Sequence, residues 1–308
     1  VVVGATATGK TDLSIGLARR FDAPVVSCDS RQMYREMPIG TAAPSAEEQV
    51  GIPHYFIASR SVTEPYTSGR FELEALALLD RLFRKHDVVV MVGGSGLYAD
   101  AVCRGIDAVP GTNPELRQAV TERLEREGLD ALYAELRRHD PEYAAVVDRS
   151  NPQRIVRALE VCLETGKTYS ELRGGQAKAR PFRIVKIGVA MPRAALYERI
   201  DRRVDAMVAA GLEAEARRLL PLRELNALQT VGYREFFDFF DGTIFRDEAI
   251  ELIKRNSRRY AKRQITWFAR DPEITWFERN KTDFADVDEI ERHIRLQLAP
   301  TTHEPSER

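Results

Sequence analysis

Four residues near the start of the chain have the types and spacing of a phosphate-binding loop. Gly4, Gly9, Lys10 and Thr11 match the pattern G-x-x-x-x-G-K-[ST], between an apolar run and a helical pattern. The glycines let backbone amides converge on an anion, and the start of the helix adds a positive field. Lys10 adds a full charge, and the Thr11 hydroxyl is suited to bind Mg²⁺. The loop predicts a diphosphate or triphosphate ligand rather than a plain glycine-rich turn, but it does not specify the reaction.

The strand that carries a magnesium-binding acid in many ATP-using enzymes ends differently in this chain. The run VVVMV at 88–92 is followed by GGSGLY, which places glycines and Ser95 at its end. Kinases and NTPases usually hold Mg²⁺ with an acid there, whereas Asp87 lies at the opposite end of the run. The mismatch argues against an ATPase. The glycines allow close backbone approach to a ligand, although a plain turn accounts for the pattern as well.

A second polar segment, CDSRQMYR, follows the apolar run at 24–28. Ligands of open parallel sheets bind outside the carboxyl ends of the strands, so Asp29 should lie beside the phosphate loop. Asp29 could act as a base or a metal-linked carboxylate, and Gln32 could hydrogen-bond an adenine edge. Asp29 or Ser30 could instead cap a helix, and the spacing leaves both interpretations open.

The elements that position these residues are predicted to be parallel strands. Runs at 1–4, 24–28, 54–57, 88–92 and 184–190 are apolar on both faces, as in buried parallel strands. Helical patterns alternate with them, which is typical of an α/β domain. We therefore expect a P-loop NTPase-like parallel sheet flanked by helices. After Pro192 the chain is predicted to be helical almost to a frayed tail.

One long segment has a different pattern. It has helical periodicity, many Arg and Glu and no strand pattern, and it ends in RGGQAKAR. We predict that residues 1–110 and 179–308 form the catalytic core with C-terminal helices. Residues 111–178 are predicted to form an inserted all-helical domain.

Composition excludes several classes of protein. The 308 residues carry 46 Lys and Arg against 47 Asp and Glu, which argues against indiscriminate coating of nucleic acid. Three scattered cysteines give neither a disulfide framework nor a Cys-type zinc site, which favours a cytoplasmic location. The longest strongly apolar run is VVVMV, too short to cross a bilayer, so no membrane partner is expected.

The segment IKRNSRRYAKRQITWFAR at 253–270 has a concentrated positive charge. Six cations form two neighbouring i,i+4 rows, namely Lys254, Arg258, Lys262 and Arg255, Arg259, Arg263. A solvated helix usually intersperses acids, yet no Asp or Glu occurs from 253 to 270. The charge pattern predicts contact with nucleic acid.

At this point the sequence resembles a known family. The motifs GATATGKT, DSRQMYREMPIGTAAP, GGSGLY, NPQRIVRALEV, RVDAMVAAGLEAE, LQTVGYRE and KRQITWFARD occur in the order seen in bacterial tRNA dimethylallyltransferases. The resemblance extends over nearly the whole chain except the tail. It implies transfer of a dimethylallyl group from dimethylallyl diphosphate to the exocyclic amine of the adenosine 3′-adjacent to the anticodon. No phosphoryl group would move, which explains why β-strand acids for γ-phosphate cleavage are missing.

The resemblance also implies catalytic roles. Asp29 would be the general base, Ser95 would bond the target nucleotide in place of the family's usual threonine, and Arg203 would contact the diphosphate. The diphosphate would be bound by Gly4, Thr6, Thr8, Gly9, Lys10 and Thr11. Thr11 would also be the protein ligand of a Mg²⁺ cofactor.

The predicted partner is the anticodon stem-loop of tRNA, bound by a monomer. The predicted tRNA contacts are Asp29, Ser30, Arg31, Gln32, Ser95, Arg117, Gln153, Arg154, Arg157, Tyr233, Arg258, Lys262, Arg263, Gln264 and Trp267. The helical domain would contribute Arg117 and the Q-R-x-x-R motif. The arginines of that motif could instead form ion pairs with residues such as Glu160.

Three other functions remain alternatives. A P-loop kinase of a small metabolite would use residues 111–178 as a lid. An isopentenyltransferase of free adenine nucleotides would share the loop and Asp29, but the long insertion and the basic helix favour tRNA. A non-catalytic RNA-binding protein would not need the combined set of Lys10, Thr11 and Asp29.

Overall fold

The computed structural model describes residues 1–308 except 50, 108, 110–112, 176, 280–286 and 300–308. The chain divides into two compact units, Val1–Cys103 with Arg180–Arg308, and Arg104–Ala179. The tail predicted beyond residue 299 and the domain boundary predicted after residue 110 fall on residues outside the described part.

The first unit contains a six-stranded parallel sheet with the order β3-β2-β4-β1-β5-β6. The strands are β1 (Val2–Gly4), β2 (Val25–Ser27), β3 (His54–Tyr55), β4 (Val90–Gly93), β5 (Lys186–Ala190) and β6 (Ile274–Glu278). The predicted parallel α/β fold and its five predicted strands are confirmed, with ends that differ by one or two residues.

The sixth strand is a correction to the prediction of helix after Pro192. β6 pairs with β5 along its whole length, from Lys186–Ile274 to Ala190–Glu278. Its residues alternate between buried or partly buried and more exposed positions, because β6 lies at the edge of the sheet. A search for strands apolar on both faces therefore missed it.

Helices of the first unit surround this sheet. They are α1 (Lys10–Arg20), α2 (Ala46–Gln49), α3 (Ser68–Leu82), α4 (Gly96–Cys103), α10 (Arg193–Ala209), α11 (Leu212–Leu219), α12 (Arg234–Phe240), α13 (Arg246–Phe268) and α14 (Val287–Leu298), with short 3₁₀ turns at Leu220–Leu222 and Asn226–Leu228. No described helix is long and apolar enough to cross a bilayer.

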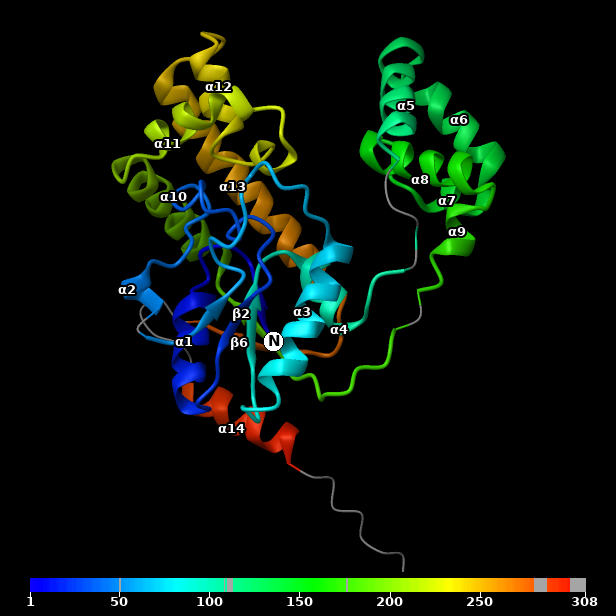
Figure 1. The fold of residues 1–308 in the computed structure, drawn as a ribbon. Helices are drawn as coiled ribbons and strands as arrows, with labels where there is room; N and C mark the ends of the chain where they lie inside the picture. Colours follow the sequence, from blue (N-terminus) through cyan, green and yellow to red (C-terminus); the bar gives the residue numbers. More distant parts are fainter. Residues whose placement is uncertain (50, 108, 110–112, 176, 280–286, 300–308) are drawn as a thin grey trace, which may run out of the picture. The chain divides into compact units, whose positions relative to one another are not determined.

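Successive strand residues belong to different cores. Val2 and Val25 pack in a cluster with residues of α1 and α14, whereas Val3 and Val26 pack in a cluster with residues of α3 and α4. Figure 1 shows α1 and α3 on opposite sides of the strands. Because both faces are covered, the strands read as continuous apolar runs, and their carboxyl ends are left to bind a ligand.

The second unit is helical throughout its described residues. It contains α5 (Pro114–Glu127), α6 (Leu129–His139), α7 (Pro141–Val146), α8 (Pro152–Thr165) and α9 (Tyr169–Leu172). Proline begins three of these helices after an Asn or Asp cap, at Asn113, Asp140 and Asn151. Leu132, Leu136, Ile155 and Leu159 are fully buried in a separate core, so this unit has the packing of an independent domain.

Candidate active site

The predicted phosphate loop joins β1 to α1, and its glycines are required by geometry. A Cβ atom on Gly4, whose φ is +147°, would lie 2.6 Å from the Val189 carbonyl oxygen. Gly9 caps α1 with φ 89° and ψ 24°, a left-handed conformation. The chain can therefore wrap tightly and start a helix whose first amide groups face the carboxyl edge of the sheet.

Several polar groups of the loop are used to hold its own shape. The Lys10 ammonium and the Thr8 hydroxyl donate to the Ala5 carbonyl at 2.6 and 2.8 Å. The Thr6 N–H donates to the Gln264 side chain at 2.8 Å. The Thr8 hydroxyl and the Thr6 amide are thus engaged within the protein, and these two groups are not directed at a ligand.

Two arginines that were not predicted from the sequence donate hydrogen bonds to carbonyl groups of the loop. Arg199 on α10 donates to the Ala7 carbonyl at 2.9 Å, and Arg279, directly after β6, donates to the Thr8 carbonyl at 3.2 Å. Arg199 precedes Arg203 by one helical turn, a spacing that could have identified it. Arg279 had no such indication, because β6 itself was missed.

Lys10, Arg203 and Asp29 share one electrostatic environment. Burial and the nearby charge of Arg203 lower the pKa of Lys10 to about 8, whereas Asp29 opposes the shift. Burial also lowers the pKa of Arg203, again opposed by Asp29. Two partly desolvated cations, one of which lowers the pKa of the other, form a site that favours an anion.

Asp29 caps a turn rather than a helix. Its Oδ1 atom accepts the N–H groups of Arg31 and Gln32 at 2.9 and 3.3 Å, and the residues that follow form turns. Within the described part of the chain, Oδ2 has no hydrogen-bond partner. One oxygen therefore fixes the carboxylate while the other stays available as a base.

Ser95 and Ser30 join the loops that follow β4 and β2. The Ser30 N–H donates to Ser95 Oγ at 2.9 Å, and Ser95 Oγ donates to Ser30 Oγ at 3.0 Å. The predicted gathering of the β2 and β4 ends is thus observed. Gln32 is occupied differently, since its amide nitrogen donates to the carbonyls of Thr41 and Ala42 at 3.3 and 3.0 Å. That arrangement leaves it poorly suited to the adenine edge.

Burial argues against two of the predicted tRNA contacts. Tyr233 is fully buried and donates its hydroxyl to Glu215 at 2.6 Å. Gln264 is 5% exposed, and its amide bonds the Thr6 N–H and the Gly94 carbonyl. Neither side chain is exposed enough in this structure to contact an RNA directly.

Two of the three cations in the first row on α13 are paired with acids of another helix, so the basic face is smaller than the sequence pattern indicates. Lys254 pairs with Asp205 at 2.8 Å, and Arg258 pairs with Asp201, both acids from α10. The missing acids are supplied by a neighbouring helix, which no pattern within α13 could reveal. Lys262 and Arg263 lie exposed, and Trp267 is 36% exposed with its indole N–H on Asp100 at 2.9 Å.

In the helical unit, Glu160 forms ion pairs with two of the three predicted arginines. Arg117 lies 2.6 Å and Arg157 lies 3.4 Å from its carboxylate, which is 2% exposed. The ion-pair alternative for Arg157 is therefore observed. Gln153 and Arg154 are exposed at the start of α8, and their RNA contact stays a prediction.

Comparisons with known proteins identify the family of this chain. A family model described as IPP transferase matches residues 32–271. The chain belongs to the IPP transferase family. A tRNA dimethylallyltransferase of Cytophaga hutchinsonii is 54% identical over 97% of this chain and 96% of its own length. A tRNA dimethylallyltransferase of Porphyromonas gingivalis is 52% identical over 90% of this chain and 92% of its own length.

Solved structures of the family have the same fold. The full-length tRNA isopentenylpyrophosphate transferase of Bacillus halodurans superposes with a TM-score of 0.72 at 38% identity, covering 96% of this chain and 95% of that chain. A eukaryotic dimethylallyltransferase, described as acting on tRNA, superposes with a TM-score of 0.74 at 27% identity. It is matched over 90% of this chain and 72% of that chain.

Tyr260 is a site residue that the family motifs alone did not single out. Burial and the neighbouring charge of Asp29 raise its pKa to about 12, whereas a hydrogen bond with Ser95 opposes the shift. Its hydroxyl thus stays protonated beside the two residues predicted to handle the acceptor. Its position one turn before Gln264 was the available clue.

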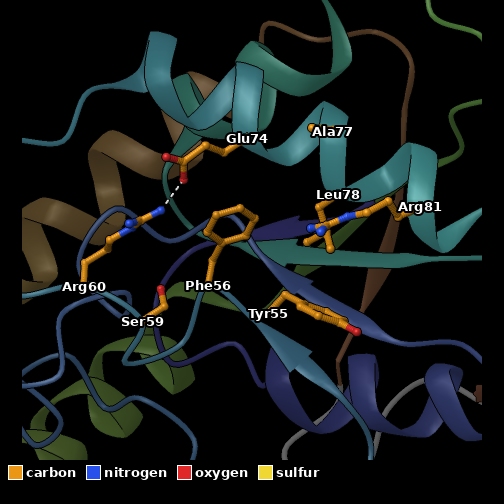
Figure 2. Close-up of a pocket in the computed structure, with 8 residues that line it drawn as sticks. All are labelled: Tyr55, Phe56, Ser59, Arg60, Glu74, Ala77, Leu78 and Arg81. Atoms are coloured by element: carbon orange, nitrogen blue, oxygen red, sulfur yellow. Dashed lines mark hydrogen bonds and ion pairs between the residues drawn. The ribbon is translucent and has the colours of Figure 1, made fainter.

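Outside this site, a surface cavity of about 580 Å³ lies between the end of β3 and α3. Figure 2 shows Arg60 paired with Glu74 in the wall of the cavity, with the Phe56 ring beside this ion pair. The cavity is lined by Tyr55, Phe56, Ser59, Arg60, Glu74, Ala77, Leu78 and Arg81. None of the predicted site residues lines it.

Proposed function

We propose that this chain is a tRNA dimethylallyltransferase. It transfers the dimethylallyl group of dimethylallyl diphosphate to the exocyclic amine of the adenosine 3′-adjacent to the anticodon, and it releases diphosphate. The observation that carries the proposal is the placement of Asp29 in the electrostatic environment of Lys10 and Arg203. A base beside an anion site suits attack on an allylic diphosphate by a weak nucleophile.

The donor half of the site stabilises the leaving group. As the allylic carbon–oxygen bond breaks, negative charge accumulates on the diphosphate oxygens. Lys10 and Arg203 are already desolvated, so they can stabilise this charge strongly. Arg199 and Arg279 donate hydrogen bonds to loop carbonyls and keep the loop in place.

The acceptor half moves a proton. The adenine amine forms a bond to the allylic carbon, and its excess proton passes to the available Oδ2 atom of Asp29. Ser95 is held by Ser30 and offers its hydroxyl to the target nucleotide. The protonated Tyr260 hydroxyl keeps Ser95 in place beside the base.

The residues present fit a magnesium ion bound mainly by the substrate. Within the described residues, no group of three or more His, Cys, Asp or Glu side chains could hold a metal. Mg²⁺ usually keeps several waters and binds substrate phosphates with one or two protein ligands. Thr11, at the start of α1, is the side chain that would hold it, and the ion would supply neutralising charge for the diphosphate.

The RNA would be bound by exposed polar residues of each unit. The exposed Lys262 and Arg263 on α13, and Gln153 and Arg154 in the helical unit, supply cations and hydrogen-bond donors. The target adenosine must be unstacked to reach Asp29, a step for which single-stranded anticodon loops are suited. We further propose that the enzyme works as a cytoplasmic monomer.

Label transfer tests the proposal. The protein is incubated with Mg²⁺, ATP, dimethylallyl diphosphate labelled in its allyl group, and either unmodified tRNA or free AMP. We expect label in the tRNA and none in AMP. Label in AMP alone would favour a transferase of free nucleotides, and ATP consumption with an unlabelled tRNA would favour a kinase.

A further inference from the structure

One side chain of α13 connects the two halves of the proposed site. Gln264 Oε1 accepts the N–H of Thr6 in the phosphate loop at 2.8 Å. Its Nε2 donates to the carbonyl of Gly94, in the turn that follows β4, also at 2.8 Å. Gln264 is 5% exposed, so both hydrogen bonds are made away from water.

Two neighbouring residues on the same face of α13 contact the same turn after β4. Tyr260, one turn earlier, bonds Ser95, and the Trp267 ring, one turn later, packs on Gly96. A Cβ atom on Gly94 would lie 2.3 Å from Gln264 Nε2, and one on Gly96 would lie 2.2 Å from Trp267. Positions 94 and 96 of the turn are therefore glycines because α13 approaches them too closely for a side chain.

We propose that Gln264 is a positioning residue that keeps the diphosphate loop and the acceptor turn in register. The inference rests on the proposed function and adds a residue to it. The Thr6 amide belongs to the loop that holds the donor, and Gly94 immediately precedes Ser95, which holds the acceptor. A fixed side chain between them sets the distance between the allylic carbon and the amine.

Loss of the two Gln264 hydrogen bonds should lower kcat far more than it weakens the binding of diphosphate. Gln264→Met keeps most of the side-chain volume and removes both hydrogen bonds. A misplacement of about 1 Å costs roughly 100-fold in rate, so we expect kcat to fall about 100-fold. The Kd for inorganic diphosphate should stay within about threefold, because the loop keeps its own amides and Lys10.

Thr266→Ala is the matched control on the same helix. Thr266 is exposed, and among the described residues its hydroxyl bonds only the Lys262 carbonyl of its own helix. Its kcat should equal that of the wild type. All rates are measured below the unfolding temperature of each variant, with the folded fraction determined by circular dichroism.

Gln264→Glu provides a readout that a merely structural role would not give. A protonated glutamic acid can accept from Thr6 and donate to Gly94, whereas a carboxylate cannot donate. Burial should raise its pKa. The ratio of its kcat to the wild-type kcat should fall about tenfold per pH unit once the group ionises. All other ionisable groups of the site are common to both proteins, so the ratio isolates residue 264.

The outcomes separate the two proposals. A low kcat in folded Gln264→Met, with rescue of Gln264→Glu at low pH, supports the positioning role. Wild-type kcat in both folded variants, or a loss no greater than the unfolded fraction, overturns it while the proposed function stands. If the wild type transfers nothing to tRNA, the proposed function fails, and the positioning role falls with it.

Discussion

At the scale of single residues, the shifted pKa of Lys10 is the property with the most direct consequence. Its ammonium loses its proton at about pH 8 in the free protein, because burial and Arg203 disfavour the charge. The unfolded chain still binds that proton up to about pH 10.4. The free energy of unfolding should therefore increase, and the folded state become more stable, as pH rises from about 8 to about 10.4.

Diphosphate affinity should respond with the opposite sign. Above about pH 8 the wild type loses the Lys10 charge, so its affinity for inorganic diphosphate, relative to Lys10→Met, should decline. At pH 7, Lys10→Met should weaken binding by about 1.5–3 kcal/mol, the usual worth of a hydrogen bond to a charged group. Isothermal titration calorimetry measures both effects, and a pH-independent ratio would contradict the assignment of Lys10 to the anion.

Asp29 should affect turnover and leave binding intact. Asp29→Asn keeps the Oδ1 acceptor for Arg31 and Gln32, so the turn should persist. It loses the base, and the single-turnover rate should fall by about 10²–10⁴-fold. The Kd for inorganic diphosphate is the control and should not rise. Full activity of Asp29→Asn would show that another group accepts the proton.

At the scale of elements, α13 has one face inside the protein and another outside. Lys262 lies on the outer face, where it is exposed. If it contacts a phosphate, Lys262→Ala should weaken anticodon stem-loop binding uniformly and reduce the slope of log affinity against log salt by about 1. Arg292→Ala, at an exposed position on α14, is the matched control and should leave the slope unchanged. Equal slopes in all three proteins would place the RNA elsewhere.

Elements also show what the sequence could and could not predict. The loop at Gly4–Thr11 and the strands around it were predictable because their patterns are local. The burial of Gln264 and Tyr233 depends on the packing of α13 and α12 against the rest of the unit, which no local pattern contains. β6 was missed because an exposed edge strand alternates rather than reading as continuously apolar.

At the scale of the whole molecule, each compact unit has its own core. Arg180 donates to the carbonyls of Val102 and Ala101, both at 2.8 Å, so the chain leaves and re-enters the sheet unit at neighbouring points. Replacing residues 104–179 by a short Gly-Ser linker should therefore leave a folded sheet unit. This variant should bind inorganic diphosphate like the full chain.

The same variant should lose at least tenfold in affinity for anticodon stem-loop RNA, if the helical unit supplies tRNA contacts. Filter binding measures that affinity, and the diphosphate Kd is the internal control for folding. Unchanged RNA affinity would assign tRNA recognition to the sheet unit alone. The predicted contacts at Gln153 and Arg154 would then be wrong.

The measurement that tests the central claim most directly is mass spectrometry of the nucleosides of a tRNA incubated with the protein, Mg²⁺, dimethylallyl diphosphate and ATP together. The account predicts that the adenosine 3′-adjacent to the anticodon gains one dimethylallyl group, that free diphosphate is released in equal amount, and that ATP remains intact. An unmodified tRNA with ATP hydrolysed would contradict it, because the phosphate loop would then be serving phosphoryl transfer.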